Sequence, residues 1–221
     1  MATPRVLITG FGPFPGVLNN PSAWLVEALA ARPPLDCNGD IHVRILPTAW
    51  EEAALMPRFY ARLQPHVMIH FGVSERAKAV RIERSAHNRA ASRPDAKGAL
   101  PATTLIREQG PDRFDTRLPA AQLAARLKTR GLPAVASRSA GSYLCNFLYY
   151  HSLGWALAQT DPRIVLFVHI PPLSTKGGPF GAEALLAGAQ EILSFVFASV
   201  DRHAQAGSSD DRARPTVALG K

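Results

Sequence analysis

Cys145 is the residue whose setting best suits covalent chemistry. It lies three residues after Ser142, which follows the turn Ala140-Gly141 and which we expect to cap the start of a helix. The sulfur would then lie in the first turn of that helix, where free backbone amides and the positive end of the helix dipole favour a thiolate. Cys145 is therefore a candidate nucleophile. The alternative is that it fills space on an apolar helical face, as many cysteines do.

A nucleophilic cysteine needs a base, and the base needs a group that orients it. His169 and His70 each close an apolar run that is typical of a buried strand, and α/β folds place their sites at the carboxyl ends of such strands. Either histidine could equally be a core residue satisfied by hydrogen bonds. Glu83, flanked by Ile82 and four nearby arginines, fits the third member of a triad or a paired structural carboxylate. The residues alone leave these alternatives open.

The loop between Gly10 and Gly16 follows the first expected strand, where a dinucleotide-binding turn would lie. A GxGxxG pattern would need glycine at position 15, which is Pro15, and no helix follows at once. Phe11 and Phe14 within this loop are more typical of an apolar pocket wall, or of a rigid turn with core aromatics, than of a phosphate cradle. We therefore do not interpret this loop as a nucleotide site.

The elements that must position these residues alternate along the chain. We expect strands at 5–9, 41–46, 67–71, 135–137 and 164–170, and helices from about 22, at 50–63 with a kink or a later start at Pro57, and at 120–128, 142–159 and 182–200. Residues 72–119 are read as long loops with one or two hairpins. The alternation predicts an α/β fold in a single domain, with a mostly parallel central sheet and helices on both faces. The catalytic domain would span 1–204, and the polar tail 205–221 is predicted to be disordered.

Composition limits the class of protein. The chain has 221 residues, of which 47% are hydrophobic and 19% charged, which suits one globular domain with a substantial core. Two cysteines exclude a disulfide-rich scaffold, and no Cys/His spacing indicates a zinc site. No apolar run reaches the length of a membrane span, and the N-terminus lacks the layout of a signal peptide. These features predict a soluble, reduced, intracellular domain.

The net charge of +8 suggests a polyanionic partner until it is divided along the chain. Residues 76–97 carry seven basic and two acidic side chains, so this segment alone is +5. The last 20 residues add +2, and the rest of the chain is only +1. The basic segment brackets Glu83. If Glu83 is catalytic, we expect this segment to surround a catalytic loop and to attract acidic peptides, and we expect no nucleic-acid partner.

Four sequence segments contain candidate catalytic and pocket residues. They are residues 9–16 (TGFGPFPG) with Asn20-Pro21-Ser22 after them, 82–88 (IERSAHN), 139–146 (SAGSYLCN) and 168–171 (VHIP). Together they resemble the signature motifs of the pyroglutamyl peptidase I family, also called pyrrolidone-carboxylate peptidases, which are cysteine peptidases. The resemblance runs from about residue 5 to residue 200.

This resemblance implies an exopeptidase that removes N-terminal pyroglutamate (5-oxoproline) from peptides through a thioester. It implies Cys145 as nucleophile, His169 as base and Glu83 as the group that orients the histidine. No metal and no organic cofactor are implied. The expected partners are N-pyroglutamyl peptides and other copies of the chain in a dimer or tetramer, without a membrane, in the cytoplasm.

The family correspondence also predicts a substrate pocket. Phe11 and Phe14 would sandwich the pyroglutamyl ring, and Asn20 would form a hydrogen bond near it, with Val73 and Leu144 completing the pocket. Two departures from the family pattern stand out. Pro15 replaces a glycine and stiffens the loop, and Val73 replaces a glutamine of many bacterial members, so that only a backbone contact would remain there.

Three other functions compete with this interpretation. A different cysteine-dependent amidase is the nearest, and a panel of N-blocked anilides would separate it. A non-catalytic binder of pyroglutamyl peptides would need a broken triad, whereas all three members are present. A nucleic-acid-binding module would show a recognition helix or stacking aromatics, which the sequence lacks.

Overall fold

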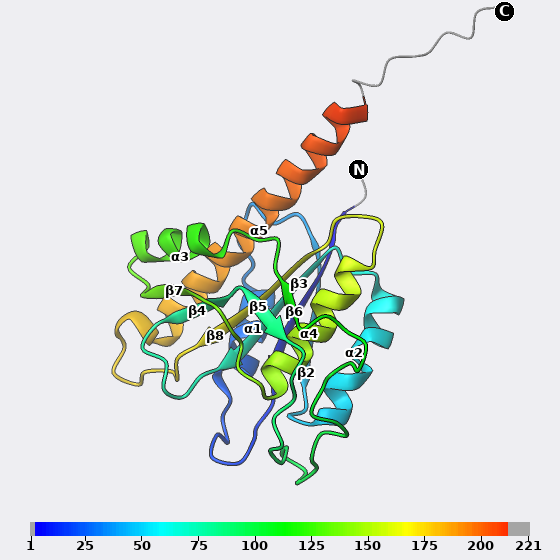
Figure 1. The fold of residues 1–221 in the computed structure, drawn as a ribbon. Helices are drawn as coiled ribbons and strands as arrows, with labels where there is room; N and C mark the ends of the chain where they lie inside the picture. The colour runs from blue at the N-terminus through cyan, green and yellow to red at the C-terminus, as the bar shows by residue number, and fades with distance from the viewer. Residues whose placement is uncertain (1–2, 212–221) are drawn as a thin grey trace, which may run out of the picture.

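A six-stranded sheet forms the centre of the molecule (Figure 1). The computed structural model describes residues 3–211, and the side chains of residues 3–200. The strands of the sheet lie in the order β2 (Asp40–Leu46), β1 (Arg5–Phe11), β3 (Val67–Val73), β8 (Ile164–Ile170), β4 (Val80–Glu83) and β7 (Ala134–Ser137). Four of the five neighbouring pairs are parallel, and the β4–β8 pair is antiparallel. The predicted mostly parallel sheet is confirmed.

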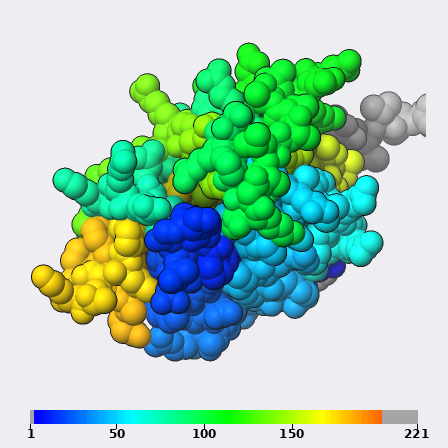
Figure 2. Space-filling model, turned by 90° about the horizontal axis from the view of Figure 1, so that it is seen from below, coloured from blue at the N-terminus to red at the C-terminus, as the bar shows by residue number. Residues whose placement is uncertain are grey.

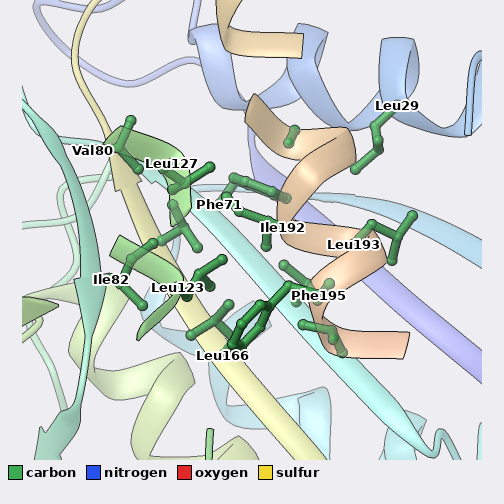
Figure 3. Packing of buried hydrophobic residues seen from close by; sticks show 14 of the residues in the cluster. Leu29, Phe71, Val80, Ile82, Leu123, Leu127, Leu166, Ile192, Leu193 and Phe195 are labelled. Carbon is green, nitrogen blue, oxygen red and sulfur yellow. The ribbon is translucent and has the colours of Figure 1, made fainter. Parts of the chain in front are cut away.

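Helices cover both faces of this sheet, as the alternating sequence pattern predicts. On one face α1 (Pro21–Ala31), α3 (Ala120–Thr129) and α5 (Ala182–Asp211) bury a large cluster that includes Leu29, Leu123 and Leu193 (Figure 3). On the other face α2 (Trp50–Leu63) and α4 (Leu144–Leu157) pack around residues such as Tyr60 and Leu148. Since β8 is buried along its whole length, its apolar sequence is what two covered faces require.

The segment 72–119 differs from the prediction in one respect that matters for the site. It is not only loops and hairpins, because β4 within it joins the central sheet between β8 and β7. A separate two-stranded antiparallel sheet pairs β5 (Ser85–His87) with β6 (Arg113–Asp115). β4 has only four residues, two of them charged, so its burial comes from long-range pairing that no local pattern shows.

Of two helix starts near the site, one agrees with the prediction and one differs from it. Helix α2 spans Trp50–Leu63, which confirms the predicted bounds, and Pro57 lies inside it, so the alternative of a later start at Pro57 is wrong. The Asp95 carboxylate accepts a hydrogen bond from the Trp50 backbone N–H at 2.9 Å and so satisfies a free donor of the first turn. Helix α4 begins at Leu144 with Tyr143 as N-cap, and no side chain caps it. The predicted cap at Ser142 is therefore wrong, although Cys145 does lie in the first turn.

The last helix is longer than predicted. α5 continues to Asp211, past the predicted start of the tail at residue 205, and residues 212–221 of that predicted tail lie outside the described residues. The stretch Ala182–Val200 is long and apolar enough to cross a membrane by length and composition alone. More than half of it is buried within the protein, where it forms part of the core in Figure 3. Its apolar character is thus explained by packing on the sheet.

The carboxyl ends of β1, β3 and β8 meet at one edge of the sheet because these strands are parallel. Figure 2 shows this face, where the blue loop after β1 lies between the green segment and the yellow to orange segment after β8. Sequence segments far apart in the chain therefore converge here. This is the edge at which doubly wound α/β folds build their sites.

Candidate active site

The Cys145 side chain lies at the start of α4, against the end of β3. A Cβ placed on Gly72 would lie 3.0 Å from the Cys145 sulfur and 3.0 Å from Cζ of Phe167. Glycine at this position therefore leaves the space that the thiol occupies. Gly72 also lies directly opposite His169 in the parallel pairing of β3 with β8, so the strands bring the sulfur and the imidazole to the same point.

His169 is hydrogen-bonded to Glu83 across the antiparallel pair of strands. Its Nδ1 lies 2.8 Å from Oε1 of Glu83, whose side chain is completely buried. In the register of this pair His169 faces Arg81, and Glu83 is the diagonal neighbour two residues on. The carboxylate thus holds one ring nitrogen and leaves the other, Nε2, for the sulfur.

The electrostatic setting of His169 favours imidazolium. Burial by itself lowers the pKa of this histidine, but the negative charge on Cys145, a hydrogen bond to its side chain and the Glu83 carboxylate together outweigh burial and raise the pKa to about 9. A protonated His169 beside the Cys145 sulfur is the arrangement that these charges support.

Arg81 contributes a cation that the sequence reasoning did not single out. Its Nε donates to Oε1 of Glu83 at 3.2 Å, and its Nη2 donates to the Ser137 hydroxyl at 2.7 Å. The other carboxylate oxygen of Glu83 is buried with no hydrogen-bond partner among the described residues. Arg81 and Glu83 are two residues apart, a spacing that puts both side chains on one face of a strand. This spacing predicts the contact only if β4 is first recognised as a strand.

His70, the rival histidine, lies in the core. Its Nδ1 is 2.8 Å from the Thr9 hydroxyl, its side chain is fully buried, and burial lowers its pKa to about 3. It is therefore a neutral structural histidine, and among the described residues no hydrogen bond joins it to Cys145 or Glu83.

A cavity of about 520 Å³ opens beside the cysteine. The structure brings together there all the residues predicted to bind substrate, and with Cys145 they line the cavity: Phe11, Phe14, Asn20, Val73 and Leu144. His169 and Glu83 are buried and are not part of the lining. The cavity therefore presents the sulfur to solvent and keeps the other two groups shielded from it.

Asn20, which is predicted to form a hydrogen bond near the substrate ring, also fixes the local structure. Its Oδ1 accepts from the backbone N–H and the hydroxyl of Ser22, which makes it the N-cap of α1. Its Nδ2 donates to the Gly12 carbonyl at 3.0 Å. Only the second hydrogen of this amide is left for another acceptor, so Asn20 mainly fixes the loop that carries Phe11 and Phe14.

Two asparagines tie the long loops to the site. The buried amide of Asn146 donates to the carbonyls of His87 and Arg89 and accepts from the His87 N–H at 2.8 Å. The Asn88 side chain similarly binds the backbone of Arg107: its Nδ2 donates to the Arg107 carbonyl, and its Oδ1 accepts from the Arg107 N–H. The residue that follows the cysteine thus fixes the loop that follows Glu83.

The fold and this arrangement define a class: a cysteine hydrolase with an α/β fold, in which a helix-terminal cysteine, a strand-end histidine and a buried glutamate act together. The comparisons narrow the class further. The family model described as pyroglutamyl peptidase matches residues 4–177, and the chain belongs to this family of cysteine peptidases.

Individual relatives agree with this assignment. The chain is 32% identical over 205 residues to human pyroglutamyl-peptidase 1, covering 89% of this chain and 94% of that protein. It is 30% identical over 169 residues to the pyrrolidone-carboxylate peptidase of Thermococcus litoralis, covering 76% of each. The crystal structure of pyrrolidone carboxyl peptidase from Fervidobacterium islandicum AW-1 superposes with a TM-score of 0.80 at 30% identity, over 89% of this chain and 99% of the other.

Proposed function

We propose that this protein is a cysteine exopeptidase that hydrolyses the bond after an N-terminal pyroglutamate. The observation that carries the proposal is the position of Cys145, which lines the cavity next to a buried His169–Glu83 pair. Within that pair Nδ1 of His169 lies 2.8 Å from Oε1 of Glu83. Membership of the pyroglutamyl peptidase family supports the substrate, and the site supports a cysteine-dependent route.

In the first half of the reaction the Cys145 thiolate attacks the carbonyl carbon of the pyroglutamyl residue. The carbon–sulfur bond forms as the carbonyl π electrons move to oxygen. His169, as imidazolium, then gives its proton to the departing amine as the carbon–nitrogen bond breaks, which leaves a thioester. In the second half, water loses a proton to His169 and attacks the thioester, releasing pyroglutamate and the thiolate.

The start of α4 is suited to stabilising the oxyanion of each tetrahedral intermediate. The first backbone N–H groups of a helix have no partner within it, and no side chain caps α4. The N–H of Cys145 is the donor nearest the reacting carbon, and a donor of this kind typically contributes about 3–4 kcal/mol to the transition state.

The apolar part of the cavity suits the small, neutral lactam ring. Phe11 flanks it from the end of β1 and Phe14 from the loop that follows, and Leu144 lies next to the nucleophile in sequence. Val73, the last residue of β3, offers no side-chain hydrogen bond, so backbone groups must recognise the ring amide there.

The test is hydrolysis of pyroglutamyl anilide in comparison with prolyl and glutaminyl anilides. We expect release of aniline from the pyroglutamyl substrate alone and its loss in Cys145→Ser, with the fold retained. Cys37→Ser is the matched control, because Cys37 is the other free thiol and packs against the core on the opposite side of the sheet. Preference for another anilide would favour a different cysteine amidase, and tight binding of the peptide without turnover would indicate a non-catalytic binder.

We further propose that the enzyme acts in the cytoplasm as a dimer or tetramer, without nucleic-acid or membrane partners. Both cysteines are free, which suits a reducing compartment, and the family resemblance suggests an oligomer. Light scattering of the purified protein tests the oligomer, and a single-subunit mass would refute it.

A further inference from the structure

The cavity beside Cys145 has two chemically different parts. The apolar part contains Phe11, Phe14 and Leu144, whereas the open rim carries the exposed charged residues Glu75, Arg76 and Arg93. If the lactam ring occupies the apolar part, the residue after it extends toward the charged rim, because the scissile bond lies at the sulfur. The rim therefore faces the leaving group.

Arg93 is the rim cation that the protein holds in place. Its guanidinium carbon lies 4.7 Å from the centre of the Tyr143 ring, over which it stacks. The Tyr143 hydroxyl donates to the Pro94 carbonyl at 2.9 Å, and the Trp50 indole N–H donates to the Arg93 carbonyl at 3.1 Å. Since Tyr143 is two residues before Cys145, this contact fixes Arg93 relative to the nucleophile.

The acid nearest to Arg93 in sequence does not neutralise it. The carboxylate of Asp95 accepts from the backbone N–H groups of Trp50, Lys97 and Ala99, at 2.8 to 2.9 Å. No ion pair joins Arg93 to an acidic side chain in the part of the chain that the structure describes, and Glu75 on the same rim forms none with it. Arg93 is thus a positioned cation with an open hydrogen-bonding edge beside the site.

We propose that Arg93 binds a carboxylate on the residue that immediately follows pyroglutamate, so that the enzyme prefers acidic leaving groups. The proposal rests on the proposed pyroglutamyl peptidase activity and names its preferred substrate class. A guanidinium presents several N–H donors in a plane and accepts a carboxylate with two hydrogen bonds. The carboxylate can come from an acidic side chain or from the free C-terminus of a dipeptide.

The experiment compares three substrates that differ only in charge at this residue: pyroglutamyl-glutamine amide, pyroglutamyl-glutamate amide and free pyroglutamyl-glutamine. We expect kcat/KM of the wild type to be about fivefold higher for at least one acid than for the neutral amide, as a solvent-accessible ion pair allows. Arg93→Gln should reduce this acid-to-amide ratio to about one. The two acids show which source of carboxylate Arg93 accepts.

Two controls isolate Arg93 from general charge. Arg58→Gln makes the same charge change on the exposed side of α2, away from the cavity, and should leave the ratio at its wild-type value. Arg76→Gln removes the other rim cation and should change the ratio less than Arg93→Gln does. Equal rates on all three substrates, or a ratio that depends on Arg76 instead, would overturn the assignment. Failure to hydrolyse any of the three substrates would instead refute the proposed function.

Discussion

The Arg81 guanidinium reaches along its own strand to the carboxylate of Glu83, with Nε 3.2 Å from Oε1. That oxygen is also the one that His169 contacts, so one atom of the carboxylate takes both donors while the other has no partner among the described residues. Of the basic residues at 76–97, Arg81 is the one that the structure brings into an ion pair with Glu83. The basic segment 76–97 therefore supplies one specific contact to the site, the ion pair of Arg81 with Glu83.

We expect Arg81→Met to lower kcat about tenfold, because the buried carboxylate loses a charged hydrogen-bond donor and holds the imidazole less firmly. The Arg81 side chain is 42% exposed, so water replaces part of its effect and the loss stays moderate. Arg81→Lys keeps the charge and should recover part of the activity. The measurement is kcat for pyroglutamyl anilide across pH. The alkaline limb of the profile should move to higher pH in the methionine variant, because the loss of a nearby cation favours the imidazolium form of His169.

Arg84→Met is the matched control for this prediction. It removes a neighbouring charge from an exposed side chain one residue after Glu83. We expect its pH profile to match that of the wild type. If both variants shift the profile equally, the effect belongs to the general field of the segment and not to the Arg81 contact.

Gly72→Ala should lower activity by more than its loss of stability explains. The added methyl group would lie 3.0 Å from the Cys145 sulfur and from Phe167, so the sulfur must move by a few tenths of an ångström. A displacement of that size at a nucleophile costs about tenfold in kcat. Gly39→Ala is the contrast, since its methyl group would meet Phe197 and Val6 in the core, and it should lower the free energy of unfolding instead. Full kcat in Gly72→Ala would contradict the close packing of the thiol.

Substitution of His169 should mainly reduce activity, whereas substitution of His70 should mainly reduce stability. His169→Ala removes the proton donor and acceptor and should lower kcat about 10²- to 10⁴-fold. His70→Ala removes a buried ring that is hydrogen-bonded to Thr9, so it should reduce the free energy of unfolding by about 2–4 kcal/mol. Urea titration and anilide hydrolysis measured on both variants decide the matter. A larger loss of kcat at fixed stability in His70→Ala would reverse the assignment.

The positions of Cys145 and His169 could be predicted because they depend on local sequence patterns. The apolar runs of β1, β3 and β8 and the spacing of α4 are visible in the sequence, and together they place Cys145 at a helix start and His169 at a strand end. The choice between His169 and His70 came from the family resemblance, since both end similar strands. The structure distinguishes them by their hydrogen-bond partners. His169 contacts the Glu83 carboxylate, whereas His70 contacts the Thr9 hydroxyl.

The features that could not be predicted depend on long-range contacts. β4 is too short to show a period, and its antiparallel pairing with β8 is what brings Arg81 and Glu83 to His169. The start of α4 moved from Ser142 because the Ser142 carbonyl accepts from the Ala91 N–H and Gly141 takes a positive φ of 86°. β8 is distant in sequence from β4, and Ala91 is distant from Ser142, so no local rule identifies these two contacts.

The charge on Cys145 should affect the pKa of His169, and a titration of His169 should measure that effect. Above a pH of about 9 the imidazolium loses the proton that it donates to the leaving amine, so we expect kcat/KM to fall there. In Cys145→Ser the thiolate charge and its hydrogen bond are absent, burial then weighs more heavily, and the pKa of His169 should fall below its wild-type value. NMR titration of the ring protons measures this directly. His151 is an internal reference, because burial and the nearby Arg107 hold its pKa at about 4 without involving the cysteine. An unchanged His169 titration in the serine variant would show that the thiolate is not its partner.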